Sequence, residues 1–331
     1  MGTAKLPVVP ETTVKAVLEA VVVGYRHFDT ASMYATERPL GEALEEAVRR
    51  GLLASREEVF VTSKLWCTQC HPHLVLPSLR ESLQNLQMEY VDLYLIHWPI
   101  SLKPGPAVFP VKREDAVPFD FAGVWRAMEE CHRLGLAKAI GVSNFTTSHL
   151  HKLLAAATVP PAVNQVAEHN TTRSPSSTGL NIHWDSALAA CGVQVEMNPV
   201  WQQRKLREYC AEKGIHVAAY SPLGGQNWSG DGNAVLDSEV LAEIAKARGK
   251  TVAQVALRWI YEQGATPIVK SFSKERLKEN LGIFDWGLTD DDLRKIGQIP
   301  QKKIVRAETV LFSAEGEFTS ADLAEMEIVE E

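Results

Sequence analysis

Four polar residues in the first third of the chain, Asp29, Tyr34, Lys64 and His97, are of types that hold or transfer protons, and each ends or follows an apolar run. Each run has the composition of a buried parallel strand. Polar side chains at the C-terminal ends of successive barrel strands are typical of catalytic residues. The runs are residues 27–29, with Tyr34 in the loop beyond them, residues 59–64 and residues 91–97.

Together these residues can form a proton donor for a carbonyl group. A tyrosine with an ordinary pKa near 10 is a poor acid at neutral pH. A neighbouring Lys64 ammonium is expected to lower the pKa of Tyr34, and Asp29 to keep that ammonium charged. His97 is expected to orient the carbonyl or share the proton. General acid catalysis of this kind contributes about 10²–10⁴-fold, and the hydride would have to come from a nicotinamide cofactor.

Each of the four residues, taken alone, also has a purely structural explanation. A loop tyrosine, a solvated lysine at a strand end and a core histidine are all common. Their occurrence at three consecutive strand ends favours catalysis over structure.

Short apolar strands alternate with longer amphipathic segments, which predicts a parallel sheet closed into a (β/α)8 TIM barrel. No change of composition marks a linker, so residues 1–331 are expected to form a single domain. The expected helices are residues 11–23, 38–50, 74–88, 120–135, 147–156, 201–213, 236–248, 251–263, 273–282 and 289–297. The expected strands are residues 25–29, 59–64, 91–97, 138–143, 215–221 and 266–271, with another beginning at Ala162.

Three segments depart from this pattern. Residues 1–10 are too few for a full first strand, which is therefore expected to be truncated at its N-terminus. Residues 167–195 interrupt the sixth strand and are expected to be an atypical insertion, because so long a structureless loop is unusual in a barrel. Strand character returns only at Val193-Gln194-Val195-Glu196. Residues 307–331 form an acidic tail, with eight Asp or Glu and no Lys or Arg from Glu308 onward.

The cofactor site is expected near the C-terminus. No Gly-x-Gly-x-x-Gly follows the first strand, which argues against a Rossmann site. Lys270 and Ser271 end a strand, and Arg276, Glu279 and Asn280 lie on the next helix. Cations beside a helix N-terminus favour a phosphate group, and barrel enzymes often bind phosphate after their last strands. This pattern favours the 2′-phosphate of NADPH over NADH.

Other strand ends supply further candidates. Ser143 and Asn144 could hydrogen-bond a carboxamide, and Tyr220 could stack on a flat ring. Trp98 and Trp125 are candidates for an apolar substrate wall. The glycine-containing loop at residues 222–235 is a candidate lid over the cofactor.

A metal centre is not expected. Cys67, Cys70 and His71 have the spacing of a haem attachment site, and with His73 they resemble half of a zinc site. No second pair of ligands stands at a suitable spacing. This stretch is therefore interpreted as the loop after Lys64, near the mouth of the site.

The composition argues against several classes of partner. The formal net charge is −7, so there is no overall basic surface for nucleic acid or an anionic membrane. No apolar run approaches the ~20 residues of a membrane span, and no secretory signal is visible. Five cysteines, an odd number, fit free thiols in a reducing compartment. A cytoplasmic, monomeric enzyme acting on a small carbonyl compound is expected.

Three motifs are similar to those of the aldo-keto reductase superfamily: Gly24-Tyr-Arg-His-Phe-Asp-Thr-Ala31, Ile140-Gly-Val-Ser-Asn-Phe145 and Ile268-Val-Lys-Ser271. The resemblance covers nearly the whole chain outside residues 167–195 and implies a (β/α)8 barrel that reduces carbonyl compounds with NADPH. It implies that Tyr34 is the general acid, tuned by Lys64 and Asp29, and that His97 orients the substrate. It assigns cofactor contacts to Ser143, Asn144, Gln165, Tyr220, Ser221, Leu223, Lys270, Ser271, Arg276, Glu279 and Asn280.

The stretches at residues 65–72, 219–228 and 299–306 resemble one plant branch of the superfamily. Members of that branch use NADPH to reduce a 3″-keto acid to 2′-deoxymugineic acid, in making an iron-chelating phytosiderophore. Related plant reductases that act on other ketones or aldehydes, such as chalcone-type polyketides, share much of this pattern. Two further alternatives are an inactive product of truncation or mis-splicing and a cofactor-binding regulatory subunit.

The superfamily motif Asn-Gln-Val-Glu-Met-Asn-Pro is divided in this chain. Asn164-Gln165-Val166 stands before residues 167–195, and Glu196-Met-Asn-Pro199 stands after them. The insertion itself ends on a second Gln194-Val195. Gln165 and Gln194 are therefore rivals for one nicotinamide contact, and the sequence leaves the choice open.

Overall fold

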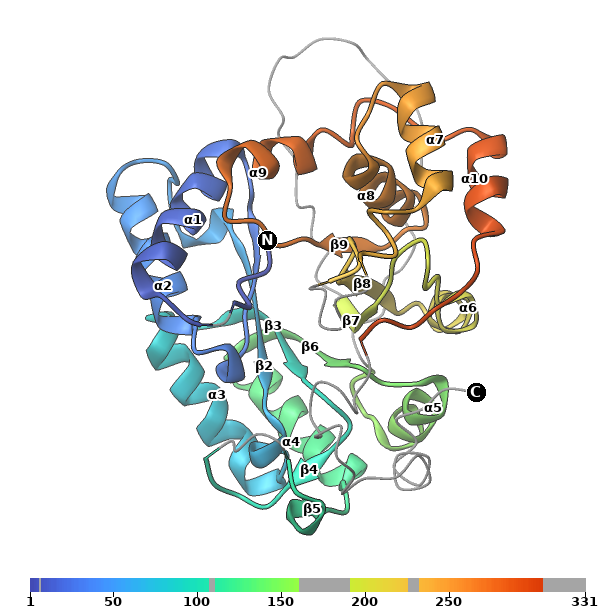
Figure 1. Ribbon diagram of the computed structural model, residues 1–331. Coiled ribbons are helices and arrows are strands. Elements are labelled where there is room, and N and C mark those ends of the chain that lie inside the picture. The colour runs from blue at the N-terminus through green and yellow to red at the C-terminus, as the bar shows by residue number, and fades with distance from the viewer. Residues whose placement is uncertain (6, 107–110, 161–190, 226–231, 306–331) are drawn as a thin grey trace, which may run out of the picture.

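The computed structural model describes residues 1–5, 7–106, 111–160, 191–225 and 232–305. Within these ranges, seven parallel strands follow one another in the order β1-β2-β3-β6-β7-β8-β9 and curve into a nearly closed barrel surrounded by helices (Figure 1). The expected barrel is therefore confirmed. The strands are β1 (His27–Asp29), β2 (Phe60–Leu65), β3 (Val91–Ile96), β6 (Ala137–Ser143), β7 (Cys191–Glu196), β8 (His216–Tyr220) and β9 (Thr266–Ile268).

Helices follow most of these strands, and a small antiparallel hairpin, which the sequence did not indicate, lies outside the barrel sheet. The hairpin pairs β4 (Ser101–Leu102) with β5 (Ala116–Val117). None of the helices in the described ranges is long and apolar enough to cross a membrane. The helices are α1 (Pro10–Val23), α2 (Glu37–Arg49), α3 (Pro72–Leu86), α4 (Phe121–Arg133), α5 (Thr147–Ala156), α6 (Arg204–Glu212), α7 (Glu239–Arg248), α8 (Val252–Glu262), α9 (Lys274–Leu281) and α10 (Asp290–Gly297).

Local sequence signals set several helix ends. α1 begins with Pro10, whose fixed φ suits a first helical position, and ends at Gly24, whose φ of +119° is open to glycine. Asp120 caps α4 by accepting from the Gly123 backbone N–H, and Thr251 caps α8 in the same way. These caps fix where the chain passes from each strand into its helix, and so which residues are left at the strand ends.

Residues 1–3 lie between the two outer strands of the sheet. The Gly2 N–H donates to the Val269 carbonyl at 2.9 Å, and the Thr3 N–H donates to the Asp29 carbonyl at 2.9 Å. The Asp29 N–H in turn donates to the Met1 carbonyl at 2.9 Å. This short segment therefore lies where a further barrel strand would stand, and it holds the end of β1 next to β9.

β7 corrects the expected limits of the insertion. Val193 and Gln194 pair with Val142 and Ser143 of β6, and Val195 continues the strand against β8. These residues, counted with the insertion, are thus strand residues, as the return of strand character at Val193–Glu196 predicts. The second Gln-Val repeats the alternation that places one side chain inside the barrel and the next outside. The strand expected from Ala162, the rest of the insertion to residue 190 and the acidic tail lie outside the described residues.

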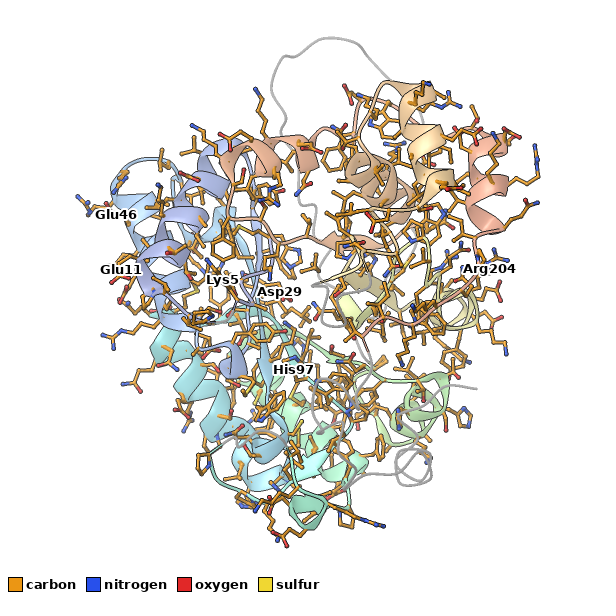
Figure 2. The ribbon with its side chains drawn as sticks, in the orientation of Figure 1. Lys5, Glu11, Asp29, Glu46, His97 and Arg204 are labelled. Carbon is orange, nitrogen blue, oxygen red and sulfur yellow. The ribbon has the colours of Figure 1, made fainter. Side chains whose placement is uncertain are left out.

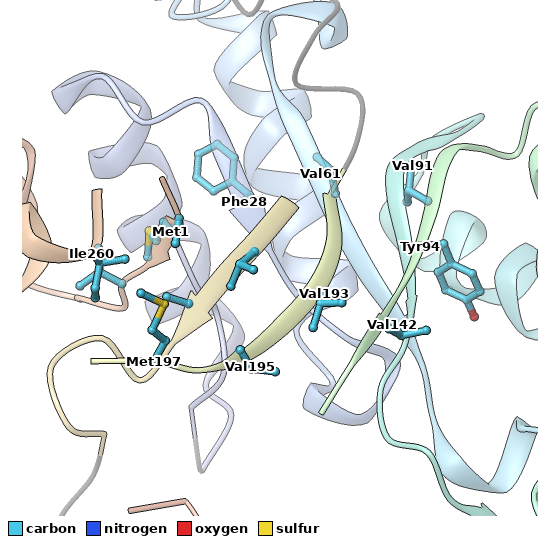
Figure 3. Close-up of a cluster of buried hydrophobic side chains, with 14 of the residues drawn as sticks. Met1, Phe28, Val61, Val91, Tyr94, Val142, Val193, Val195, Met197 and Ile260 are labelled. Atoms are coloured by element: carbon cyan, nitrogen blue, oxygen red, sulfur yellow. The ribbon is translucent and has the colours of Figure 1, made fainter. Parts of the chain in front are cut away.

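The strand side chains alternate between two apolar groups. Leu93 and Leu95 of β3 belong to a small group with Ala218 and Ile268, while Tyr94 belongs to the main core between the sheet and the helices. Figure 3 shows part of that main core. The same alternation turns polar residues of other strands toward the barrel interior.

Candidate active site

The four candidate catalytic residues meet at the C-terminal ends of β1, β2 and β3. Asp29 ends β1, Lys64 is the last residue but one of β2, and His97 follows β3 directly. Tyr34 ends a short 3-10 turn formed by Ser32–Tyr34. In Figure 2 the labelled Asp29 and His97 lie near the middle of the molecule. The sequence prediction that these side chains come together is therefore supported by their positions.

Lys64 and Asp29 form a buried ion pair. Lys64 Nζ donates to Asp29 Oδ1 at 2.7 Å and to the Thr30 carbonyl at 2.8 Å. Burial opposes the charged ammonium, but the charge of Asp29 and the Tyr34 phenol outweigh it and raise the pKa of Lys64. Lys64 is therefore a fixed positive charge at neutral pH.

Tyr34 lies between Lys64 and His97. Its ring centroid is 4.9 Å from Lys64 Nζ, and its hydroxyl is 3.3 Å from His97 Nε2. Burial raises the pKa of Tyr34, and the Lys64 charge opposes this rise without cancelling it. The expectation of a lowered pKa for Tyr34 is therefore corrected. The desolvation of a buried phenolate is larger than the stabilisation that the Lys64 ammonium gives it. The phenol keeps its proton at neutral pH.

His97 is neutral in this arrangement. Burial and the nearby Lys64 charge lower the pKa of His97 well below its usual value. The Trp66 ring lies edge-on to the imidazole, with centroids 5.2 Å apart. Among the described residues, His97 Nδ1 has no hydrogen-bond partner. A neutral imidazole beside a protonated phenol can orient an oxygen atom without adding charge.

Short hydrogen bonds fix the turn that carries Tyr34. Ser32 Oγ donates to the Lys64 carbonyl at 3.0 Å, which ties the turn to β2. The Thr30 and Thr36 hydroxyls on either side of the turn are 2.9 Å apart. Tyr34 is therefore held by both ends of its loop, although it lies outside any strand.

Asn144 connects three of the strand ends. Its Nδ2 donates to the His97 carbonyl at 2.9 Å and to Ser143 Oγ at 3.1 Å, and its Oδ1 accepts from the Tyr220 hydroxyl at 2.6 Å. Both N–H bonds of this amide are therefore used, and one lone pair of Oδ1 remains. Ser143 can still donate its own hydroxyl proton. A carboxamide placed here would receive a hydrogen bond from Ser143 and give one to Asn144.

Gln194 is the rival glutamine that lies in the site. It is 4% exposed and stands on β7 beside Ser143 of β6. Its carbonyl accepts from the Asn144 N–H at 2.9 Å, and its Nε2 donates to Asp29 Oδ2 at 2.7 Å. Gln165 lies outside the described residues. Of the two glutamines, Gln194 is thus the one that the described residues place beside Asp29 and Asn144.

The residues expected at the phosphate end lie after β9. Lys270 is exposed, and Ser271 is buried with its Oγ accepting from the Ser273 N–H at 3.2 Å. Neighbouring atoms still desolvate the Lys270 ammonium in part, and this partial desolvation and the ammonium of Lys5 lower the pKa of Lys270. Lys5, whose Nζ is 4.5 Å from the centroid of the Phe272 ring, was not found from the sequence. The only available signal was that Lys5 follows the first-strand segment.

The remaining candidates on α9 have different environments. Arg276 is exposed in the first turn, where its N–H donates to the Ser273 hydroxyl at 3.3 Å. Glu279 accepts from the Thr251 hydroxyl at 2.6 Å and so joins α9 to α8. Asn280 is buried, 6% exposed. Arg276 is thus available to an anion, whereas Glu279 already has a structural partner.

Ser221 and Leu223 begin the loop after β8. The Ser221 carbonyl accepts from Asn198 Nδ2 at 3.3 Å, and the Leu223 carbonyl accepts from Asn233 Nδ2 at 2.9 Å. Ser221 has a φ of +48°, which is uncommon for a residue with a side chain. The loop is thus anchored at both ends, and its role as a lid stays a prediction, since residues 226–231 lie outside the described residues.

An apolar wall stands beside His97. Trp66, Trp98 and Met33 belong to one cluster with Cys67 and residues of the β4–β5 region. Trp98 was expected here. Trp66 was missed, although it follows Lys64 by two residues and therefore leaves β2 at the same end.

Trp125 does not belong to this wall. It is fully buried in the main core on α4, and its indole Nε1 donates to the Val159 carbonyl at 3.0 Å. The expectation is corrected, because a large apolar side chain on the inner face of a helix packs against the sheet and not at the strand ends.

Cys67 and Cys70 are free and buried. Burial raises the pKa of both thiols, and the Cys70 thiol donates a hydrogen bond to the Trp66 carbonyl at 3.4 Å. Thiols in this state are poor nucleophiles and poor metal ligands. Across the described residues, no three His, Cys, Asp or Glu side chains are grouped as metal ligands would be.

Comparison with known families decides the wider class. A sequence model described as the aldo/keto reductase family matches residues 1–181 and 181–300. The chain belongs to the aldo/keto reductase family. As an aldo-keto reductase, it is an NADPH-dependent oxidoreductase.

Named relatives agree with this assignment. The chain is 55% identical over 306 residues to deoxymugineic acid synthase 1-A of Triticum aestivum, covering 92% of this chain and 88% of the relative. It is 52% identical over 323 residues to a (1S)-1,7-diacetoxy-luvungin A aldo-keto reductase of Citrus sinensis, covering 97% and 91%. These similarities support carbonyl reduction.

Solved structures show the same barrel. A Bombyx mori aldo-keto reductase in complex with NADP superposes with a TM-score of 0.76 at 32% identity, over 93% of this chain and 91% of that one. The aldose reductase of Schistosoma japonicum gives a TM-score of 0.76 at 30% identity, over 96% and 95%. The expected (β/α)8 fold and NADP cofactor class are confirmed.

Proposed function

We propose that this aldo-keto reductase uses NADPH to reduce a 3″-keto acid to 2′-deoxymugineic acid in phytosiderophore synthesis. The observation that carries the proposal is the buried arrangement of Tyr34, Lys64, Asp29 and His97, which is built to protonate a carbonyl oxygen. The 55% identity to deoxymugineic acid synthases supports the substrate. The odd number of cysteines supports a reducing compartment such as the cytoplasm, and the enzyme is proposed to act as a monomer.

The proton transfer follows from the pKa directions. The substrate oxygen is placed between the Tyr34 hydroxyl and His97 Nε2, which are close enough to bond one oxygen together. Reduced nicotinamide, when bound, supplies the hydride. Tyr34 then gives its proton to the developing alkoxide, and Lys64 stabilises the phenolate that remains. Asp29 keeps the ammonium charged and oriented while this charge develops.

The residues of the site fit an NADPH molecule chemically. Ser143 can donate to the carboxamide, and Asn144 and Gln194 have free acceptor lone pairs for its N–H groups. Tyr220 offers a ring face at the end of β8. Lys5, Lys270 and Arg276 take part in none of the ion pairs between described residues, so their charges are open to phosphate.

A second substrate class is supported by the Citrus relative, which covers more of this chain. The wall formed by Trp66, Trp98 and Met33 suits an apolar ketone or aldehyde. In that case the same proton donor would act on a bulky apolar carbonyl compound, such as a chalcone-type polyketide.

The substrate test compares kcat/KM for the 3″-keto acid with kcat/KM for a bulky apolar ketone. It follows NADPH oxidation and identifies the products by mass spectrometry. A preference of about tenfold or more for the keto acid supports the proposal. Turnover confined to the apolar ketone contradicts the substrate, and no turnover of any carbonyl by the wild type contradicts the reaction. Tyr34→Phe protein measures the background rate.

A further inference from the structure

The two oxygens of the Asp29 carboxylate are held by different partners. Oδ1 accepts from Lys64 Nζ at 2.7 Å, and Oδ2 accepts from Gln194 Nε2 at 2.7 Å. The three residues are buried, with exposures of 0% for Lys64 and 4% for both Asp29 and Gln194. A hydrogen bond to a buried charge is worth about ten- to a hundredfold in an equilibrium constant. The Gln194 contact is therefore strong enough to set the carboxylate orientation.

This contact crosses the barrel interior. β1 and β7 are not neighbours in the sheet, because three strands, β2, β3 and β6, lie between them in the strand order. Gln194 is paired with Ser143 on β6 and with Ala218 on β8, so its backbone is fixed from both sides. Asp29 ends a strand of only three residues. The well-held strand thus fixes the side chain of the short one.

We propose that Gln194 is a positioning residue for the proton donor Tyr34. It holds the Asp29 carboxylate so that Oδ1 faces Lys64, the cation beside Tyr34. An ionised carboxylate only accepts hydrogen bonds, so Gln194 must turn its NH2 group toward Asp29. The inference rests on the proposed function, since the orientation of Lys64 matters to the reaction only if Tyr34 gives up its proton. The orientation itself can be tested without cofactor or substrate.

The Gln194 side chain also connects Asp29 with the proposed nicotinamide site. Its Oε1 and its second N–H are turned away from the Asp29 bond and are left for the nicotinamide carboxamide. A donor bound at Oε1 polarises the amide and strengthens its N–H bond to Asp29. Cofactor binding therefore tightens the hold on Asp29 and Lys64.

The Gln194→Glu variant tests the positioning role by a change in pH dependence. When protonated, the new side chain can donate its O–H to Asp29. When ionised, it places a second carboxylate against the first, which is unfavourable in a buried site. Among the described residues, the other titratable groups around the Asp29–Lys64 pair are Tyr34, His97, His27 and the Met1 amino group. All of these are shared with the wild type.

The measurement is urea unfolding of the cofactor-free protein at about pH 5 and about pH 8. From about pH 5 to about pH 8, the unfolding equilibrium constant of Gln194→Glu should rise, and this rise should exceed the change in the wild-type constant by about tenfold or more. Gln194→Met, which has no donor, should weaken folding by a similar factor at both pH values. The double variant Asp29→Asn with Gln194→Glu should lose the extra pH dependence, because the new amide at position 29 can donate to the new carboxylate.

The Gln194→Glu protein could fail to fold at about pH 8. In that case, a double variant with Asp29→Asn that folds at about pH 8 supports the inference equally. At saturating NADPH, kcat of Gln194→Glu should fall about tenfold or more relative to wild type from about pH 5 to about pH 8, with a smaller change in KM. A wild-type pH dependence of unfolding in Gln194→Glu, combined with weaker NADPH binding, overturns the inference, since Gln194 would then contact the cofactor alone. A wild type without turnover would refute the proposed function and leave the cofactor-free result standing.

Discussion

Lys64 Nζ lies 2.7 Å from Asp29 Oδ1, and both side chains are almost completely removed from solvent, with exposures of 0% and 6%. Burying two charges costs desolvation that is offset only by good geometry and further hydrogen bonds. The Thr30 carbonyl and the Gln194 amide supply those bonds. A buried ion pair adds little net stability to a fold. We infer that the role of this pair is to place the Lys64 charge beside Tyr34.

Removing one member of this pair should destabilise the fold. Lys64→Met leaves the Asp29 carboxylate buried and unpaired, and we expect a loss of about 3–5 kcal/mol in the free energy of unfolding. The double variant Lys64→Met with Asp29→Asn should recover part of this loss, because no uncompensated charge remains. Urea unfolding of the three proteins measures both effects. A double variant no more stable than Lys64→Met would show that the two side chains are not coupled.

Buried histidines should make the fold less stable in mild acid. Burial lowers the pKa of His216, and also of His27 and His97. Below the unfolded value near 6.5, the unfolded chain takes up protons that the folded chain does not. The free energy of unfolding therefore rises with pH up to about 6.5, by at most about 1.4 kcal/mol per pH unit for each histidine. His216→Gln, which keeps a polar partner for Thr266, should reduce that slope, and an unchanged slope would contradict the assignment.

The cations after β9 should decide between NADPH and NADH. Lys270→Met or Arg276→Met should raise the Kd for NADPH about tenfold or more, because a hydrogen bond to a charged group contributes ~1.5–3 kcal/mol. The Kd for NADH should change little. Lys246→Met, on the exposed last turn of α7, is the control for loss of surface charge. Equal weakening of both cofactors in fluorescence titrations would show that these residues do not contact the 2′-phosphate.

Glu196 should hold the segment after α10 on the barrel. Its buried carboxylate accepts from the Val305 N–H at 2.8 Å and from the Ile304 N–H at 3.2 Å. Glu196→Ala leaves both donors without this acceptor, which costs about 1–3 kcal/mol locally. Hydrogen exchange at residues 304–305 should speed up accordingly while exchange in β3 stays unchanged. Wild-type exchange rates at both positions would show that Glu196 is not the anchor.

The strand-end residues could be predicted from the sequence because a parallel barrel places them together automatically. Once the apolar runs before Asp29, Lys64 and His97 are taken as neighbouring strands, their C-terminal ends share one rim. Trp125 was misplaced because an aromatic residue in a helix gives no sign of whether it faces the core or the rim. Trp66 was missed because its place on the rim depends on where β2 ends, at Leu65.

Other properties depend on packing that local sequence does not contain. The pKa of Tyr34 is raised because its surroundings are buried, and burial depth is a property of the whole fold. The choice of Gln194 in the site depends on the register between β6 and β7. The place of Lys5 near Lys270 depends on the first residues running between β1 and β9. Each of these joins segments far apart in the chain.

The central claim is that Tyr34 gives the proton while Lys64 stabilises the phenolate left behind. The most direct test is kcat/KM for carbonyl reduction at saturating NADPH in wild type and in Tyr34→Phe. We predict a loss of about 10²–10⁴-fold, with the Kd for NADPH unchanged. A Tyr34→Phe enzyme that keeps wild-type kcat/KM would contradict the account.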